Sequence, residues 1–180
     1  EFLKDEILYL GHVVSAKGIK PDPEKVKVIK ELSPPKTVKM VRSFIGMASF
    51  YRRYIKDFAK LAQPLTELTR KNVQFSWTEH RQKSWEALKE ALVTAPVLKL
   101  PVLGKPFALF TDSSDYAIGG VLCQLEDEVY KPVYYLSHQL SKTQRKWPIL
   151  EKECYSIIFC IERFRFLLEG NGKFDIFCYH

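Results

Sequence analysis

Hydrophobic positions in the first half of the chain repeat at helical spacing. Residues 22–32 predict a short helix that the following Ser-Pro-Pro run ends. A second helix is expected to begin at Thr37, a residue type that often caps helices. A third is expected to begin after Thr78 and to end before Pro96. The expected inward-facing residues are Val26, Ile29, Val41, Phe44, Ile45, Ala48, Trp85, Leu88 and Leu92.

The second half of the chain carries short apolar runs that are typical of strands. Residues 107–110 and 118–125 are two such runs, and the small and polar residues between them predict a β-hairpin. Residues 133–136 indicate a further strand. A long helix is expected from Pro148 to Leu168, because proline suits the first turn of a helix and Gly170 suits its end. The chain therefore predicts a helical segment followed by an α+β or α/β unit.

One carboxylate, Asp112, stands at the end of the apolar run 107–110. Burial of a carboxylate is costly unless a cation or hydrogen-bond donors meet it, so a functional role would explain the position. The alternative is that Asp112 only caps the turn, because Asp and Ser are ordinary turn residues. The residues alone leave both interpretations open.

A second carboxylate, Glu153, lies on the apolar stripe of the expected helix 148–168. It shares that stripe with Ile157, Cys160 and Phe164, which is unusual for an acid. The alternative is structural, because negative charge in the first turns of a helix interacts favourably with the helix dipole. Glu153 is therefore a candidate catalytic or metal-binding residue with an ordinary alternative.

Charge is distributed unevenly over the 180 residues. The chain carries 28 Lys and Arg against 21 Asp and Glu. The whole excess of seven positive charges lies in residues 1–95, where 18 basic residues face 11 acidic ones. Such an excess favours polyanionic partners through phosphate contacts and counterion release. A merely solvated basic surface is the alternative.

Cations and aromatic rings alternate within the basic half. The cations of this stretch include Lys39, Arg42, Arg52 and Arg53, and the rings are those of Phe50, Tyr51 and Tyr54. Cations suit phosphates, and rings suit sugars or bases, so the combination fits a nucleic-acid surface. Aromatic rings equally often fill hydrophobic cores, and that interpretation stays open for each of the three.

Composition excludes several classes of protein. No apolar run approaches the ~20 residues that a membrane-spanning helix needs. Charges at Lys4, Asp5 and Glu6 argue against a secretory signal. The cysteines form no CxxC pair, so we expect reduced core thiols rather than zinc ligands or disulfides. They are Cys123, Cys154, Cys160 and Cys178. We expect an intracellular protein that is neither secreted nor bound to a membrane.

Four stretches of the chain, in order, resemble one family. Residues 111–124 are similar to the pattern TDAS-x-x-A-I-G-A-V-L-x-Q. Residues 9–15, 41–47 and 50–55 resemble F-L-G-H-x-x-S, L-R-S-F-L-G-L and Y-Y-R-R-F-I. These patterns are found in the reverse transcriptases of gypsy-type LTR retrotransposons (Metaviridae-like Pol polyproteins), from the end of the palm into the RNase H-like domain. Several motifs in register make this resemblance far more specific than any one of them.

The resemblance implies three parts. Residues 1–30 would be the end of the polymerase palm with its primer-grip hairpin, and residues 31–95 would form a helical thumb. Residues 96–180 would form the N-terminal half of an RNase H-like domain, with antiparallel hairpin strands, a helix and a parallel strand. Expected partners are RNA–DNA hybrid, DNA duplex and the rest of the Pol polyprotein, in the cytoplasm, a virus-like particle or the nucleus. Expected nucleic-acid contacts come from Leu10, Gly11, His12, Lys39, Arg42, Arg52 and Arg53.

The resemblance also implies a metal site. RNase H cleaves the RNA strand of a hybrid with two Mg²⁺ ions about 4 Å apart, which carboxylates hold. Asp112 would bridge both ions, Glu153 would hold one, and the two carboxylates would meet at one corner of the sheet. Tyr179 occupies the position of the third acid, where a neutral phenol is a poor Mg²⁺ ligand. The chain ends at His180, before a fourth acid, so the expected two-ion site is incomplete.

Two classes of function follow. The first is an enzyme part, an RNA–DNA hybrid ribonuclease joined to an RNA-directed DNA polymerase, whose own Y-x-D-D acids do not occur in this chain. The second is a catalytically dead nucleic-acid-binding remnant or a domesticated fragment. Family resemblance favours the first class, whereas Tyr179 favours the second for this chain. We expect no hybrid cleavage by the chain itself.

Overall fold

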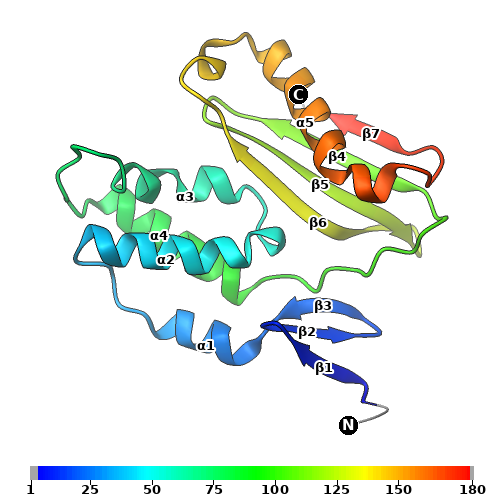
Figure 1. The fold of residues 1–180 in the computed structure, drawn as a ribbon, viewed down its shortest axis with the longest axis horizontal. Helices are drawn as coiled ribbons and strands as arrows, with labels where there is room; N and C mark the ends of the chain where they lie inside the picture. The colour runs from blue at the N-terminus through cyan, green and yellow to red at the C-terminus, as the bar shows by residue number, and fades with distance from the viewer. Residues whose placement is uncertain (1–3, 179–180) are drawn as a thin grey trace.

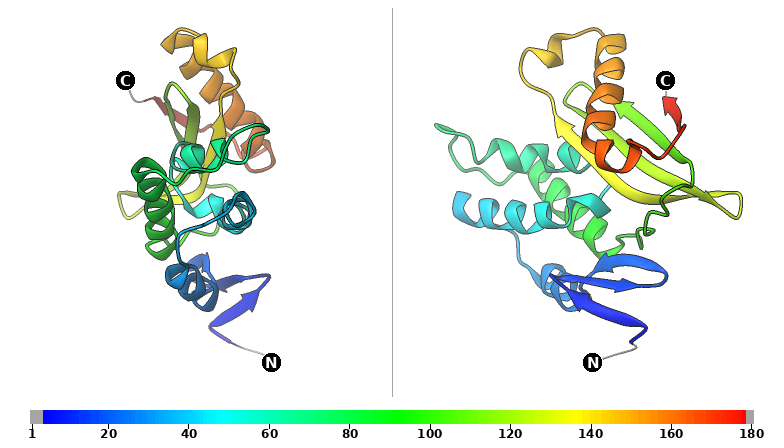
Figure 2. Two further views of the ribbon diagram at one scale, coloured as in Figure 1. Left: turned by 90° about the vertical axis from the view of Figure 1, so that its left-hand side faces the viewer. Right: turned by 45° about the vertical axis from the view of Figure 1, so that its right-hand side comes forward.

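The computed structural model describes residues 4–178, which form two β-sheets and a group of helices (Figure 1). The N-terminal sheet lies below the C-terminal sheet in Figure 1, with residues 94–106 passing between them, and the helices within residues 38–93 lie to one side (Figure 2). No helix in this range is long and apolar enough to cross a bilayer.

The N-terminal sheet is an antiparallel meander of three strands, β1 (Glu6–Tyr9), β2 (His12–Ser15) and β3 (Gly18–Pro21). Leu10 and Gly11 form the turn between β1 and β2, with φ values of 47° and 78°. A two-residue hairpin turn with both φ angles positive matches the twist of the strands that it joins. The hairpin expected at residues 9–15 is therefore present, and β3 is an addition that the sequence pattern did not predict.

Helices occupy most of residues 23–93. They are α1 (Pro23–Glu31), α2 (Val38–Phe50), the short 3-10 helix η1 (Arg52–Tyr54), α3 (Phe58–Glu67) and α4 (Glu79–Val93). The side chains of Asp22, Thr37 and Thr78 each accept a backbone N–H of the first turn, which satisfies one of the unpaired donors there. The three predicted helix starts are confirmed, whereas α3 was not predicted.

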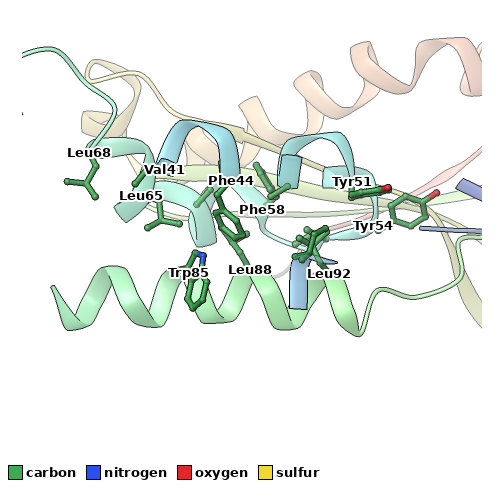
Figure 3. Packing of buried hydrophobic residues seen from close by; sticks show 14 of the residues in the cluster. Val41, Phe44, Tyr51, Tyr54, Phe58, Leu65, Leu68, Trp85, Leu88 and Leu92 are labelled. Carbon is green, nitrogen blue, oxygen red and sulfur yellow. The ribbon is translucent and has the colours of Figure 1, made fainter. Parts of the chain in front are cut away.

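The helices enclose one hydrophobic cluster. Figure 3 shows side chains from α2, α3 and α4 pointing toward one another. Its fully buried members include Val41, Phe44, Ala48, Tyr54, Phe58, Leu65, Trp85, Leu88 and Leu92. Each large side chain contributes roughly 1.5–3 kcal/mol when fully buried. The predicted inward face of α2 is confirmed except at Ile45, which is only half-buried.

The C-terminal unit is a four-stranded sheet covered by one long helix. Its elements are β4 (Phe107–Ser113), β5 (Ala117–Glu126), β6 (Val129–Gln139), η2 (Gln144–Lys146), α5 (Ile149–Leu168) and β7 (Asp175–Cys178). The strand order is β6-β5-β4-β7, in which β7 lies parallel to β4 and the other pairs are antiparallel. The predicted order of antiparallel strands, helix and parallel strand is confirmed.

Helix α5 packs on one face of this sheet (Figure 1). The buried side chains at this contact are Phe107, Leu109, Leu122, Val133, Cys160, Phe164 and Leu168. A Cβ atom added to Gly120 would lie 2.5 Å from the Cys160 Sγ atom, so a glycine is needed for this close approach. The contact fixes which face of the sheet the helix covers.

The segment between α4 and β4 is bound to both sheets. Leu98 exchanges two backbone hydrogen bonds with Ile19 of β3, each 2.8 Å long. The next residue, Lys99, donates its backbone N–H to a carbonyl of β6. Gln124 of β5, which is 1% exposed, accepts from the Val102 N–H and donates to the Val102 carbonyl. The segment thus joins the two sheets through a series of backbone contacts.

The four cysteines are free thiols, and they differ in burial. Cys123 and Cys160 are buried, and burial raises their pKa values to about 11 and about 12. Cys154 and Cys178 are exposed. The expectation of core thiols is therefore wrong for these two, because Cys154 lies on the solvent side of α5 and Cys178 lies on the edge strand β7, whose residues are all exposed.

Candidate nucleic-acid surface and candidate metal-binding acids

The hairpin tip that carries Leu10, Gly11 and His12 packs against the C-terminal end of α2. The Tyr51 hydroxyl donates to the Gly11 carbonyl at 3.1 Å. The His12 ring stacks on the Phe50 ring, with 5.1 Å between their centroids. Leu10 remains 72% exposed at the tip. Residues that are distant in sequence therefore form one surface at the junction of the hairpin and α2.

The electrostatic character of this junction is neutral. The Tyr54 hydroxyl and the His12 Nδ1 atom share a hydrogen bond of 2.9 Å. Burial, and then the Arg53 charge, lower the pKa of His12 below its ordinary value of 6.5. Burial raises the pKa of Tyr54 to about 12. Both rings are therefore uncharged at neutral pH, and they support the hairpin tip without adding charge to it.

The solvent face of α2 carries cations and small residues. Its exposed positions are Lys39, Met40, Arg42, Ser43, Gly46 and Phe50. A Cβ atom added to Gly46 would meet nothing within 4 Å. Sequence reasoning overlooked Gly46, although glycine inside a helix costs roughly 0.5–1 kcal/mol relative to alanine and is a recognisable signal. The face combines a bare stretch of backbone with two cations and the 55%-exposed Phe50 ring.

Arg52 and Arg53 lie away from this face, where η1 meets β6. The Arg52 Nη2 atom donates to the Ser137 carbonyl oxygen at 2.5 Å. The Arg53 guanidinium lies 4.6 Å from the centroid of the Tyr134 ring. The seven nucleic-acid residues expected from sequence thus occupy two places, the hairpin with α2 and the junction of η1 with β6.

Asp112 lies on the sheet face opposite to α5. It pairs with Gly119 across β4 and β5, and directly opposed residues of antiparallel strands point to the same face. A Cβ atom on Gly119 would lie 3.1 Å from the Asp57 Oδ1 atom of the helical unit. Lys56, Asp57 and Asp112 line a cavity of about 180 Å³ between that unit and the sheet. Asp112 therefore faces the loop before α3.

Glu153 lies half-buried on α5, on the other side of the sheet. The neighbouring Lys152 is buried, and its Nζ atom contacts the Asp115 carboxylate at 2.9 Å in the turn after β4. This ion pair, which sequence reasoning did not identify, holds the start of α5 at the end of β4 where Asp112 lies. Asp112 on β4 and Glu153 on α5 therefore belong to elements that are held together at the same end of the sheet.

A two-ion magnesium site needs several converging acids, and the described residues do not supply them. Within residues 4–178, no three His, Cys, Asp or Glu side chains gather closely enough to hold a metal ion. Tyr179, at the third acid position, lies outside the described residues. The described residues therefore do not by themselves form a two-ion site.

The architecture defines a class of protein. Three antiparallel strands, a covering helix and a fourth strand added in parallel form an RNase H-like fold, here preceded by a helical unit and a hairpin. The family described as "RNase H-like domain found in reverse transcriptase" matches residues 77–176. The chain belongs to this family.

Curated relatives extend the match to almost the whole chain. The Pol polyproteins of the Drosophila melanogaster transposons opus and gypsy are 38% and 35% identical to it, each over 99% of this chain. The match covers 19% and 18% of those polyproteins, so the chain spans about a fifth of their length. The resemblance to gypsy-type retrotransposon Pol proteins is confirmed.

Two solved structures share the fold. A foamy viral protease-reverse transcriptase in complex with double-stranded DNA aligns with a TM-score of 0.83 and 22% identity, over 98% of this chain and 31% of that one. The same type of protein in complex with RNA/DNA hybrid gives a TM-score of 0.81 at 22% identity, over 97% of this chain and 24% of that one. The helices and both sheets therefore recur together in reverse transcriptases.

Proposed function

We propose that this chain binds the template–primer duplex of a gypsy-type reverse transcriptase, with α2 along the duplex and the β1–β2 hairpin at the primer end. The observation that carries the proposal is the solvent face of α2. It holds Lys39, Arg42, the bare backbone at Gly46 and the Phe50 ring, and α2 contains no acidic residue.

Each part of that face has a physical use. Cations neutralise phosphates and release counterions, which gives affinity without sequence preference. A glycine without neighbours lets a sugar–phosphate backbone approach the helix closely, because no Cβ atom intervenes. The Phe50 ring continues the face to His12 at the hairpin. Duplexes bound by the structurally similar foamy viral proteins are consistent with this use of the fold.

Cleavage of the RNA strand of hybrids, with Mg²⁺ on Asp112 and Glu153, is the second candidate. It is supported by the motif at residues 111–124 and by the common end of the sheet that the two acids share. We assign it to a longer protein that supplies the remaining acids, and we expect the chain alone to be inactive.

We also propose an intracellular location, where the four free thiols are chemically stable.

Salt-dependent binding tests the first proposal. Fluorescence anisotropy with a blunt duplex should show steeply falling affinity as salt rises. The Lys39→Ala/Arg42→Ala variant should bind more weakly and with a shallower salt slope, because two phosphate contacts are lost. The matched control is Lys83→Ala/Arg165→Ala, which removes two exposed cations that are paired with Glu79 and Glu169. Equal loss in both double variants would reject α2 as the duplex site.

A further inference from the structure

A groove follows the outer edge of β6, between η1 and the second half of α5. It consists of two adjoining hollows of about 380 and 390 Å³, which share Arg52 and His138. Arg163 and Phe166 of α5 line the first hollow, and Gln139 lines the second. We call this feature the β6 groove. It is separate from the solvent face of α2.

Positive charge collects in the β6 groove without acidic partners. Among the described residues, no Asp or Glu lines either hollow. Neither Arg52 nor Arg163 forms an ion pair with any residue from 4 to 178. Both guanidinium groups act on His138, because burial, then Arg163 and then Arg52 lower the pKa of this histidine. Two cations held close together with no counter-charge favour an anionic ligand.

The groove also offers unused hydrogen-bond donors. The Gln139 Nε2 atom is buried and has no partner within the described part of the chain. Arg52 uses its Nη2 atom on the Ser137 carbonyl, which leaves its other N–H groups available. A buried donor without an acceptor is costly, so the acceptor is expected from outside the chain. Phosphate oxygens satisfy both the charge and the missing acceptor.

Aromatic rings accompany the cations. The His138 ring stacks on Phe159, with 4.5 Å between centroids, and the Arg163 guanidinium lies 5.3 Å from the same Phe159 ring. Phe166 is 71% exposed beside them. Cations with accessible rings are typical of single-strand binding, in which bases stack and phosphates pair. Hollows of this volume hold ligands of about the size of a small organic molecule rather than a double helix.

We propose that the β6 groove binds a single-stranded stretch of nucleic acid, with Arg52 and Arg163 on its phosphates and Phe166 against a base. This inference rests on the proposed function, because the strand would be the unpaired continuation of the bound template–primer. It adds to the RNase H-like half a binding role that does not depend on Asp112 or Glu153.

The test compares three oligonucleotides on the full chain by fluorescence anisotropy: a blunt duplex, the same duplex with a single-stranded tail, and a single strand. Arg163→Ala should weaken binding of the tailed duplex and the single strand about threefold to tenfold, lower their salt slope by about one, and leave the blunt duplex unchanged. Arg165→Ala is the matched control, because Arg165 is on the same helix and is paired with Glu169. This control should change none of the three affinities.

Other outcomes overturn the inference. Equal effects of Arg163→Ala and Arg165→Ala, or equal losses on blunt and tailed duplexes, would mean general electrostatics only. Polyglutamate that displaces the single strand as well as an unlabelled strand does would indicate an acidic protein as the ligand. If Arg163→Ala fails to fold, Phe166→Ala replaces it, since this exposed ring should affect binding without affecting the core.

The same data separate this inference from the proposed function. Loss of blunt-duplex binding in Lys39→Ala/Arg42→Ala tests α2 alone, whereas loss of tail binding in Arg163→Ala tests the β6 groove alone. If only the second test gives the expected result, the β6 groove is supported as a binding site and α2 is rejected as the duplex site.

Discussion

Gly119 of the C-terminal sheet packs closely against Asp57, the residue before α3. A Cβ atom added to Gly119 would lie only 3.1 Å from the Asp57 Oδ1 atom. The next residue, Gly120, lies equally close to Cys160 on the other face of the sheet, where an added Cβ atom would lie 2.5 Å from the Cys160 Sγ atom. Two consecutive glycines in β5 therefore admit the helical unit on one face and α5 on the other. This alternation explains why Asp112, opposite Gly119, faces the helical unit.

We predict that Gly120→Ala lowers the free energy of unfolding by about 1–3 kcal/mol, because the new methyl group collides with Cys160 Sγ in a packed core. Adding Cys160→Ala should recover part of the loss. Urea unfolding of the parent, both single variants and the double variant measures a coupling of about 0.5–3 kcal/mol.

The control for this cycle is Gly119→Ala with the same Cys160→Ala change. Its coupling should be near zero, because Gly119 points to the opposite face. A strong coupling of Cys160 to Gly119 instead of Gly120 would reverse the assignment of faces and place Asp112 on the side of α5.

Gly46→Ala should separate stability from binding. Alanine should stabilise α2 by about 0.5–1 kcal/mol, since the site is exposed and has room for a methyl group. Duplex affinity should fall several-fold, because the methyl group keeps the sugar–phosphate backbone away from the helix. Thermal unfolding and anisotropy on the same preparations measure both effects. Unchanged affinity in the stabilised variant would mean that the duplex does not approach α2 at Gly46.

Stability should depend on pH through His12 and His138. Their pKa values in the folded chain lie below the ordinary 6.5, so the unfolded chain binds protons first as pH falls. The free energy of unfolding should therefore be fully retained above about pH 6.5 and decrease as pH falls toward the lower folded-state pKa values. Urea unfolding at several pH values between about 7.5 and 5.5 measures this slope.

The variant His12→Gln/His138→Gln should flatten that slope, and His80→Gln, on an exposed turn of α4, is the control for the substitution itself. A parent protein that gains stability on acidification over the same range would contradict the sign of both shifts.

Hybrid cleavage by the chain itself should be absent. Tyr179 stands where the resembled motif has its third acid, and within residues 4–178 no three His, Cys, Asp or Glu side chains converge. A second Mg²⁺ would therefore be poorly held, and the two-ion mechanism needs both ions. Labelled-hybrid cleavage with Mg²⁺, with and without EDTA, tests this expectation. Cleavage that EDTA stops and that Asp112→Asn abolishes would show an active site despite Tyr179.

Local signals predicted the helices that begin at a good cap, since Thr37 and Thr78 each precede a clear apolar stripe. Helix α3 was missed because Pro64 lies inside it, and an internal proline normally argues against a helix. Its burial against α2 and α4 outweighs that local preference, and tertiary packing of this kind cannot be read from a window of sequence.

The two candidate acids show a different limit. Strand residues alternate between faces, but the run 107–110 is apolar throughout, so its pattern does not reveal which face Asp112 shares. The place of Arg52 was equally hidden, because its partner Ser137 belongs to another unit. Motifs gave the identity of the candidate residues, whereas their relative placement required the folded sheet.

The two hydrogen bonds between Ile19 and Leu98 hold the segment between α4 and β4 to the N-terminal sheet. Lys99 is also hydrogen-bonded to β6 and Val102 to Gln124. The segment between α4 and β4 is therefore hydrogen-bonded at several successive residues and has little slack. A segment that is bonded to both sheets in this way passes a displacement of one sheet on to the other. A shift of the N-terminal hairpin would therefore carry the C-terminal sheet with it, and the spacing between the hairpin tip and the β6 groove would stay constant.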